Sequence, residues 1–232
     1  FLSKDYHCLI SDCTYYPTKK FANKILKKFG VKIDFYNPSD LDTLKKKINK
    51  KTKLIFMESP ASLTFEIEDI SEIIKIAKKK KIITMLDNSW ATPFYFSPIN
   101  IGIDISILAA TKYISGHADT MLGLITVKNE KLFLKIKDTA VNLGDSPGPQ
   151  ECYLSLRGLR TLSTRLEQHR SNALKIARLL ESNDKVSKVF HPALPKNENY
   201  SLWNKYFTGS TGLFSFILKE QSKNKVFKMI DK

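Results

Sequence analysis

A lysine and an aspartate stand just beyond two apolar runs of the sequence. Lys112 follows the run Ile103–Ala109, and Asp87 directly follows the run Ile82–Leu86. A lysine amine forms a Schiff base with an aldehyde, and a carboxylate beside a pyridine nitrogen keeps that nitrogen protonated. A protonated pyridine ring is an electron sink. The pair therefore predicts a pyridoxal-phosphate site, provided that Lys112 and Asp87 meet in space.

Other polar residues follow the neighbouring apolar runs. Tyr15 comes after the first run and Glu58 after the third. Ligands of open α/β sheets bind in the crevice outside the carboxyl ends of the strands. Several polar residues at one such edge predict a binding site more strongly than any single residue does.

Short apolar runs alternate with helical patterns over the first 150 residues, which predicts an α/β fold with a mainly parallel sheet and helices on both faces. The predicted strands are Tyr6–Ser11, Val31–Tyr36, Lys53–Met57, Ile82–Leu86, Asp104–Ala109 and Leu122–Val127. The first predicted helix begins at Pro17 and ends at Gly30, with Phe21, Ile25, Leu26 and Phe29 on one face. A second helix is predicted to begin at about Asp40, and a third contains Ile70, Ile73, Ile74 and Ala77.

The second part of the chain has a different pattern. A long helical region near Gln150 carries an apolar stripe of Leu154, Leu159, Leu162, Leu166 and Leu174. The strands Val186–Phe190 and Leu213–Leu218 follow, separated by a polar loop, and an amphipathic helix is predicted from Asn224 to Lys232. We expect a large domain over residues 1–156 and part of a smaller α+β domain over residues 157–232.

The net charge of +15 comes mostly from lysine. The lysines are scattered over predicted helices, and the arginines all lie between Arg157 and Arg178. Sequence-reading nucleic-acid proteins favour arginine for base edges and often interleave aromatic residues with the charge. Lysine runs of this kind are typical of solvated helix faces. A basic nucleic-acid-binding protein without enzymatic activity is the distant alternative.

Other composition features exclude further classes. Cys8, Cys13 and Cys152 have no metal-ligand spacing and no even number for a disulfide framework, so we expect free thiols in a cytoplasmic protein. No apolar stretch approaches the ~18 residues of a membrane helix. Phe1 and the apparent break in a helix at Lys232 suggest a piece of a longer protein.

Several motifs together resemble the Cys/Met-metabolism family of pyridoxal-phosphate enzymes. The resemblance covers the whole chain, in order, at Phe56–Pro60, Leu86–Trp90, Ala109–Tyr113, Gly116–Asp119, Arg157–Leu162 and His191–Leu194. It implies that Lys112 binds the cofactor and acts as the base on the substrate's α-carbon. It also implies that Asp87 pairs with the ring nitrogen and that Tyr15 stacks on the ring.

Two further residues take roles from the same resemblance. Thr111 would donate its hydroxyl to the cofactor phosphate, and Ser62 would contact the ring hydroxyl side, where relatives have Asn. Glu58 is expected to orient a loop. His117, His169 and His191 lack the spacing for metal or triad chemistry, so we expect no metal.

Details of the motifs favour members of the family that catalyse β-elimination. Ala109 stands where many relatives have Ser, Trp90 where many have Phe or Tyr, and Ser62 replaces the Asn of γ-synthases and γ-lyases. The segment Thr208–Phe216 also resembles the β-eliminating version. We therefore expect a carbon–sulfur lyase that converts L-cystathionine to homocysteine, pyruvate and ammonia in methionine biosynthesis. A γ-synthase or γ-lyase of the same family is the alternative.

The resemblance also implies what lies outside this chain. Relatives are homotetramers, dimers of dimers, whose N-terminal segment reaches into the neighbouring subunit's phosphate site. A glycine-bearing phosphate loop and an arginine that binds the substrate carboxylate are likewise not in this sequence. We therefore expect the isolated chain to be inactive. The high lysine content carries no role in this interpretation.

Overall fold

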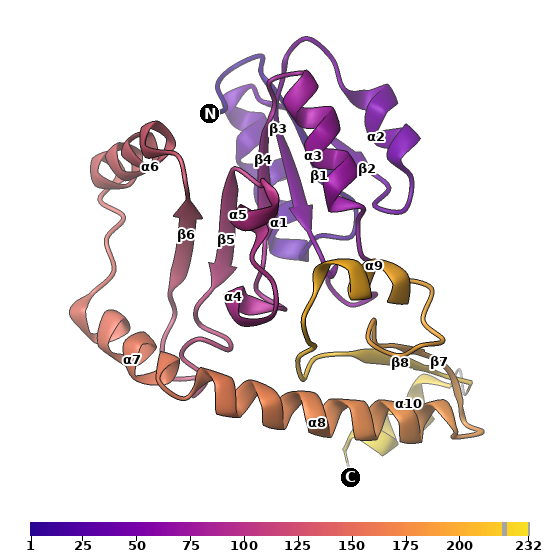
Figure 1. Ribbon diagram of the computed structural model, residues 1–232. Helices are drawn as coiled ribbons and strands as arrows, with labels where there is room; N and C mark the ends of the chain where they lie inside the picture. Colours follow the sequence, from indigo (N-terminus) through magenta and orange to yellow (C-terminus); the bar gives the residue numbers. More distant parts are fainter. Residues whose placement is uncertain (220–221, 232) are drawn as a thin grey trace.

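The larger part of the chain forms a six-stranded sheet (Figure 1). This computed structural model describes residues 1–219 and 222–231. The strands are β1 (His7–Ser11), β2 (Lys32–Tyr36), β3 (Thr52–Glu58), β4 (Ile83–Asp87), β5 (Ile105–Ala109) and β6 (Gly123–Val127). Their order is β2-β1-β3-β4-β5-β6, with β1 to β5 parallel and β6 antiparallel to β5. The predicted mainly parallel α/β fold is confirmed.

Helices cover both faces of this sheet. The first helices are α1 (Tyr16–Lys24), the 3-10 helix η1 (Leu26–Phe29), α2 (Leu41–Lys47) and α3 (Ile70–Lys79). Alternate residues of β1 point to opposite faces: Leu9 packs in one core with Ile73 of α3, whereas Cys8 and Ile10 pack in another with Ala22 of α1. A parallel sheet that is buried on both faces needs continuous apolar strands, which is the pattern that predicted these strands.

The rest of the chain adds two short helices beside the sheet and a second, smaller sheet. The elements are α4 (Thr92–Tyr95), α5 (Pro98–Ile101), α6 (Glu130–Leu143), α7 (Pro149–Leu159), α8 (Leu162–Glu181), β7 (Val186–Phe190), α9 (Tyr200–Tyr206), β8 (Ser215–Leu218) and α10 (Lys223–Ile230). Strands β7 and β8 pair antiparallel. No helix in the described ranges is long and apolar enough to cross a membrane.

Helix α8 connects the two sheets, as Figure 1 shows. Its Leu162 and Leu166 belong to the main core, whereas Ala177 packs with Val189 and Leu194 in a small separate core. The beginning of α8 therefore packs on the large sheet and its end packs on the small one. The boundary between residues 1–156 and 157–232 stays a prediction.

The first helix differs from its prediction. Gly30 ends the segment in a left-handed conformation, as expected, with φ +80°. However, the helix breaks at Ile25, and Phe21, Ile25 and Phe29 are 52%, 40% and 71% exposed. The small residue Ala22 faces the sheet instead. Leu26, in η1, is partly buried and packs against the core that contains Ala22. Because the helix breaks at Ile25 and the small Ala22 lies against the sheet, the other three predicted residues stay exposed.

The C-terminal part also departs from the pattern. The predicted long helix is two helices, α7 and α8, and Leu159 of the predicted stripe is 48% exposed. The polar loop between β7 and β8 contains α9, and α6 was not predicted. The amphipathic helix near the end is present as α10, although Lys232, at which its prediction ended, lies outside the described residues.

Candidate functional site

The predicted site residues follow strands that are neighbours in the sheet. The adjacent strands β1, β3, β4 and β5 run parallel, so their carboxyl ends meet at one edge. Glu58 and Asp87 end β3 and β4 and lie opposite each other in the strand register. Tyr15 follows β1, and Lys112 follows β5. The sheet topology therefore brings these four side chains to one edge, as the sequence predicts.

The amine of Lys112 lies over the ring of Tyr15. The distance from Nζ to the ring centroid is 5.2 Å, which is a cation–π contact. Lys112 is exposed and Tyr15 is 50% exposed. Both groups are thus open to a ligand that comes from solvent. Although Lys112 is exposed, Glu58 lies near enough to interact with its charge.

Glu58 connects two of the predicted cofactor contacts. One carboxylate oxygen accepts a hydrogen bond from the backbone N–H of Tyr15 (2.8 Å), and the other accepts one from the hydroxyl of Ser62. Burial raises the pKa of Glu58, and these two hydrogen bonds oppose that rise. Nearby Asp87 raises the same pKa and Lys112 lowers it, so both groups lie close enough to Glu58 to interact with its charge. The expected loop-orienting role of Glu58 agrees with these contacts.

Asp87 is held at the strand end by a local turn. Its carboxylate accepts a hydrogen bond from the N–H of Ser89 (2.8 Å), and the Ser89 hydroxyl accepts one from the N–H of Ala109 (2.8 Å). Asp87 does not cap a helix, because α4 begins at Thr92 with Ala91 at its N-cap. Within residues 1–219 and 222–231, neither Asp87 nor Lys112 takes part in an ion pair. The carboxylate therefore has bonding capacity left for a ligand.

Thr111 makes a backbone contact in this structure. Its hydroxyl accepts a hydrogen bond from the N–H of Leu122 (2.9 Å) and points toward the Leu122 carbonyl at the longer distance of 3.4 Å. These contacts join the Lys112 turn to the segment before β6. The hydroxyl proton would have to leave that weak contact to reach a phosphate, so the role predicted for Thr111 stays a prediction.

His117, His169 and His191 each contact other parts of the protein. His191 is fully buried, and burial lowers its pKa to about 4. His117 contacts the Ser115 carbonyl (2.6 Å), and His169 packs edge-on against Tyr113. The described part of the chain holds no cluster of side chains that could bind a metal ion.

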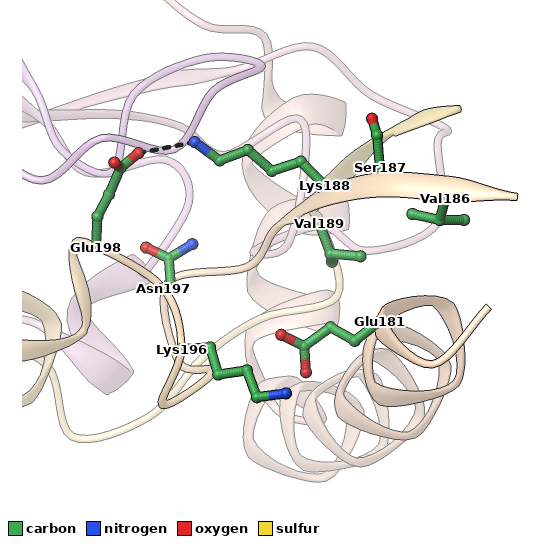
Figure 2. A pocket seen from close by; sticks show the side chains of 8 residues that line it. All are labelled: Glu181, Val186, Ser187, Lys188, Val189, Lys196, Asn197 and Glu198. Carbon is green, nitrogen blue, oxygen red and sulfur yellow. Dashed lines mark hydrogen bonds and ion pairs between the residues drawn. The ribbon is translucent and has the colours of Figure 1, made fainter. Parts of the chain in front are cut away.

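A separate hollow lies on the small sheet. Figure 2 shows it between β7, the end of α8 and the segment 196–198, with an ion pair between Lys188 and Glu198. It contains none of the predicted site residues. At the predicted site Lys112 and Tyr15 are open to solvent.

Sequence reasoning left some contacts around the site without a role. The indole N–H of Trp90 donates to the carbonyl of Leu213 (2.9 Å), and the Tyr113 hydroxyl accepts from the N–H of Gly212 (3.1 Å). Arg165 donates to the turn that carries Lys112. The only signal in the sequence was that these residues belong to, or stand beside, the motifs of the family resemblance.

These residues fit pyridoxal phosphate. The exposed amine of Lys112 suits the aldehyde, the ring of Tyr15 offers a stacking surface, and the Asp87 carboxylate is available to a ring nitrogen. Such an amine, aromatic ring and acid at the carboxyl edge of an α/β sheet define the class of pyridoxal-phosphate-dependent enzymes.

Comparison with known proteins gives the family. The sequence model of the family of Cys/Met metabolism PLP-dependent enzymes matches residues 1–232, and the chain belongs to this family. It is 42% identical, over 97% of its length, to an L-alanine/L-glutamate racemase of Wolbachia pipientis wMel, and 38% identical, again over 97%, to cystathionine β-lyase MetC of Escherichia coli K12.

A solved structure supports the fold. The crystal structure of cystathionine γ-lyase from Lactobacillus plantarum complexed with L-serine matches with a TM-score of 0.94 and 30% identity, over 97% of this chain and 59% of that one. The chain covers 55% of the Wolbachia racemase and 57% of the Escherichia coli lyase. It therefore spans little more than half the length of these relatives.

Proposed function

We propose that the whole protein is a pyridoxal-phosphate-dependent carbon–sulfur lyase that carries out β-elimination on L-cystathionine, in the manner of a cystathionine β-lyase. The observation that carries the proposal is the amine of Lys112 over the Tyr15 ring, at the sheet edge shared with Asp87 and Glu58. Relatives named cystathionine β-lyase, at 37% to 38% identity, and one named putative cystathionine β-lyase, at 40%, favour this substrate.

When bound, pyridoxal phosphate would supply an aldehyde for an amine and a ring that withdraws electrons from the substrate's α-carbon. Asp87 would hold a proton on the ring nitrogen, because an ionised carboxylate favours the charged form of a neighbouring base. The Tyr15 ring would hold the plane of the cofactor by stacking. Glu58 would hold Tyr15 and Ser62 in place through its two hydrogen bonds.

Lys112 would move the proton. Its amine would bind the cofactor first and, once the substrate amine has replaced it, take the proton from the α-carbon. A carbon that has lost this proton can expel a sulfur leaving group from the β-carbon, which gives homocysteine. The sulfur leaves with a proton, and water hydrolyses the three-carbon enamine that remains to pyruvate and ammonia. Thr111 and Ser62 would contact the phosphate and the ring hydroxyl.

Racemisation is a second candidate, because the chain is 42% identical to the Wolbachia racemase. Both reactions begin when a base removes the α-proton. A racemase returns the proton to the other face, whereas a lyase loses the β-substituent. The same first step also serves γ-lyases and γ-synthases, which remove a further proton at the β-carbon.

Product analysis of the full-length protein with added pyridoxal phosphate separates these candidates. Pyruvate from L-cystathionine supports β-elimination, 2-oxobutyrate supports γ-elimination, and D-alanine from L-alanine supports racemisation. The visible absorbance of bound cofactor is measured in parallel with Lys112→Ala as the control. Equal spectra for wild type and Lys112→Ala would contradict the proposal. A protein that turns over none of these substrates and binds nucleic acid with an affinity that falls steeply with salt would contradict it as well.

The assembly and location are also part of the proposal. We expect a homotetramer, a dimer of dimers, in the cytoplasm. Large apolar side chains exposed in this chain, such as Phe29 (71%) and Leu143 (77%), favour burial against further protein. Light scattering of the full-length protein gives the subunit number, and a monomer would contradict this expectation.

A further inference from the structure

One arginine, from a helix far along the sequence, binds the turn that carries Lys112. Arg165 lies in the first turn of α8. Its Nη1 donates to the carbonyl of Tyr113 (2.7 Å), and its Nη2 donates to the carbonyls of Ile114 (3.2 Å) and Gly158 (2.7 Å). The guanidinium thus joins the residues directly after Lys112 to the end of α7. We infer that Arg165 is a positioning residue that fixes the orientation of Lys112.

The turn itself shows why an outside donor is needed. The carbonyl of Lys112 accepts from the N–H of Gly116 (2.8 Å), and the carbonyl of Ala110 accepts from the N–H of Ser115 (2.9 Å). The next carbonyls, of Tyr113 and Ile114, receive hydrogen bonds from Arg165. Unpaired carbonyls at the end of a helical turn are costly unless a donor satisfies them. Arg165 supplies that donor from outside the turn.

Two glycines allow α7 and Arg165 to approach the turn that carries Lys112. A Cβ atom at Gly158 would lie 2.2 Å from the Ser115 carbonyl oxygen and 2.3 Å from that of Ile114. A Cβ atom at Gly116, where φ is +72°, would lie 2.2 Å from Nη1 of Arg165. Only glycine at these two positions permits α7 and Arg165 to lie directly on the backbone that follows Lys112.

The planar guanidinium is suited to this task in a way that lysine is not. Its Nε also donates to the hydroxyl of Thr161 (3.0 Å), which fixes the plane of the group. Three nitrogens with fixed directions then set the separation of α7, α8 and the turn. A base must be held close to its productive geometry, because a small misplacement lowers the rate strongly. Arg165 therefore acts on the reaction through Lys112, without contacting substrate or cofactor.

The test compares Arg165 with Arg170 in the full-length protein. Arg170 lies on the same helix, is also half-buried, and pairs with the exposed carboxylate of Glu167. The variants are Arg165→Lys, Arg165→Met, Arg170→Lys and Arg170→Met. The first readout is the rate at which pyridoxal phosphate and borohydride label Lys112, followed by mass spectrometry of its peptide. The second is the separation of kcat from KM.

We expect both Arg165 variants to lower the labelling rate and kcat by about tenfold, with KM changed by less than about twofold. Both Arg170 variants are expected to stay within about twofold of wild type, as surface substitutions usually do. Arg165→Lys keeps the charge, so failure of this variant to rescue shows that geometry matters. It also keeps the comparison usable where Arg165→Met does not fold.

A second pair of variants tests the same contact from the other side. Gly158→Ala would push α7 off the turn and should lower the labelling of Lys112 as Arg165→Lys does. Gly123→Ala is the control, because a Cβ atom at Gly123 would meet nothing within 4 Å. Wild-type labelling in the Arg165 and Gly158 variants would overturn the inference, as would an equal loss in the Arg170 variants.

The inference rests on the proposed function, and the two fail in different ways. No label on Lys112 in the wild-type protein would overturn the function and the inference together. A labelled wild type with equally labelled Arg165 variants would overturn the inference alone.

Discussion

The two edges of the parallel sheet hold polar side chains in opposite conditions. At the amino edge His7 is 2% exposed, and its ring nitrogens lie 2.8 Å from the Thr52 hydroxyl and 3.2 Å from the Asp34 carboxylate. At the carboxyl edge Lys112 is exposed beside Tyr15, and Asp87 has no ion-pair partner among the described residues. His7 at the amino edge is buried among polar neighbours, whereas Lys112 and Asp87 at the carboxyl edge keep bonding capacity for a ligand.

The difference between the two edges indicates that polar residues at the amino edge serve stability and those at the carboxyl edge serve the reaction. A buried network whose members pair with each other contributes to folding, and its removal leaves unsatisfied groups. Side chains whose charged groups have no ion-pair partner contribute little to folding, and these groups are available for reaction. Substitutions at the carboxyl edge should therefore lower activity, and substitutions at the amino edge should lower stability.

Lys112→Ala should lower kcat/KM of the full-length protein by about a thousandfold or more, because both the bond to the cofactor and the proton transfer need its amine. Its melting temperature should hardly change. Lys131→Ala, an exposed lysine of α6, is the matched control. Steady-state kinetics with L-cystathionine give the result, and wild-type activity in Lys112→Ala would contradict the assignment.

Asp87→Asn should lower kcat by about a hundredfold, because a neutral amide cannot stabilise a charged ring nitrogen as a carboxylate does. Asp42→Asn on the surface of α2 is the control, since Asp42 only pairs with Lys45. Cofactor affinity, measured by equilibrium dialysis, should fall as well. Full activity of the Asp87→Asn protein would contradict the role of Asp87 in the reaction.

Glu58→Gln should lower cofactor affinity by about tenfold, because the amide replaces one of the two accepting oxygens that hold Tyr15 and Ser62. Glu66→Gln, on the same loop, tests whether any loss of charge has this effect. Fluorescence titration with pyridoxal phosphate measures the affinity. Equal affinities for the two variants would show that Glu58 does not position the site.

Glu68, fully buried beneath the carboxyl edge, predicts a pH dependence of stability. Burial raises its pKa from 4.5 to about 8, although the hydroxyl of Tyr36 donates to it. The folded state therefore holds a proton that the unfolded state releases above pH 4.5, and stability falls as pH rises toward about 8.

Glu68→Gln should remove that fall and gain at least about 1.4 kcal/mol at pH 9 relative to wild type, the free energy of one pKa unit. Urea unfolding at a series of pH values measures it. Parallel stability curves for wild type and variant would contradict the buried, protonated Glu68.

The amino edge should show the smallest effect on the reaction. His7→Gln is expected to cost about 1 kcal/mol of stability, because the contacts with Thr52 and Asp34 are lost, while kcat stays unchanged. Thermal unfolding and steady-state kinetics on the same preparation check both expectations. A large loss of kcat would break the separation between the two edges.

The sequence predicted the sheet and the residues at its carboxyl edge because both are local signals. Strands β3, β4 and β5 are mostly apolar. Glu58 and Asp87 end β3 and β4, and Lys112 is the third residue after β5. The order of the strands, on which the meeting of Tyr15 and Lys112 depends, was not predicted, because the rules of parallel sheets only reduce the number of possible orders. The roles themselves came from the family resemblance.

Other parts could not be predicted because their signal is tertiary. Helix α6 has no buried residue, so no core-facing stripe marks it. In α1 the residue facing the sheet is the small Ala22, and an apolar pattern cannot distinguish it from the large residues that point outward. The contact of Arg165 with the Lys112 turn joins segments far apart in sequence, and only the folded chain shows it.

A crystal structure of the full-length protein with pyridoxal phosphate would show whether Lys112 and Asp87 hold the same ring. We expect continuous electron density between Nζ of Lys112 and the cofactor, with an Asp87 oxygen within about 3 Å of the ring nitrogen. Cofactor density joined to another lysine, or a ring nitrogen that faces away from Asp87, would contradict this expectation.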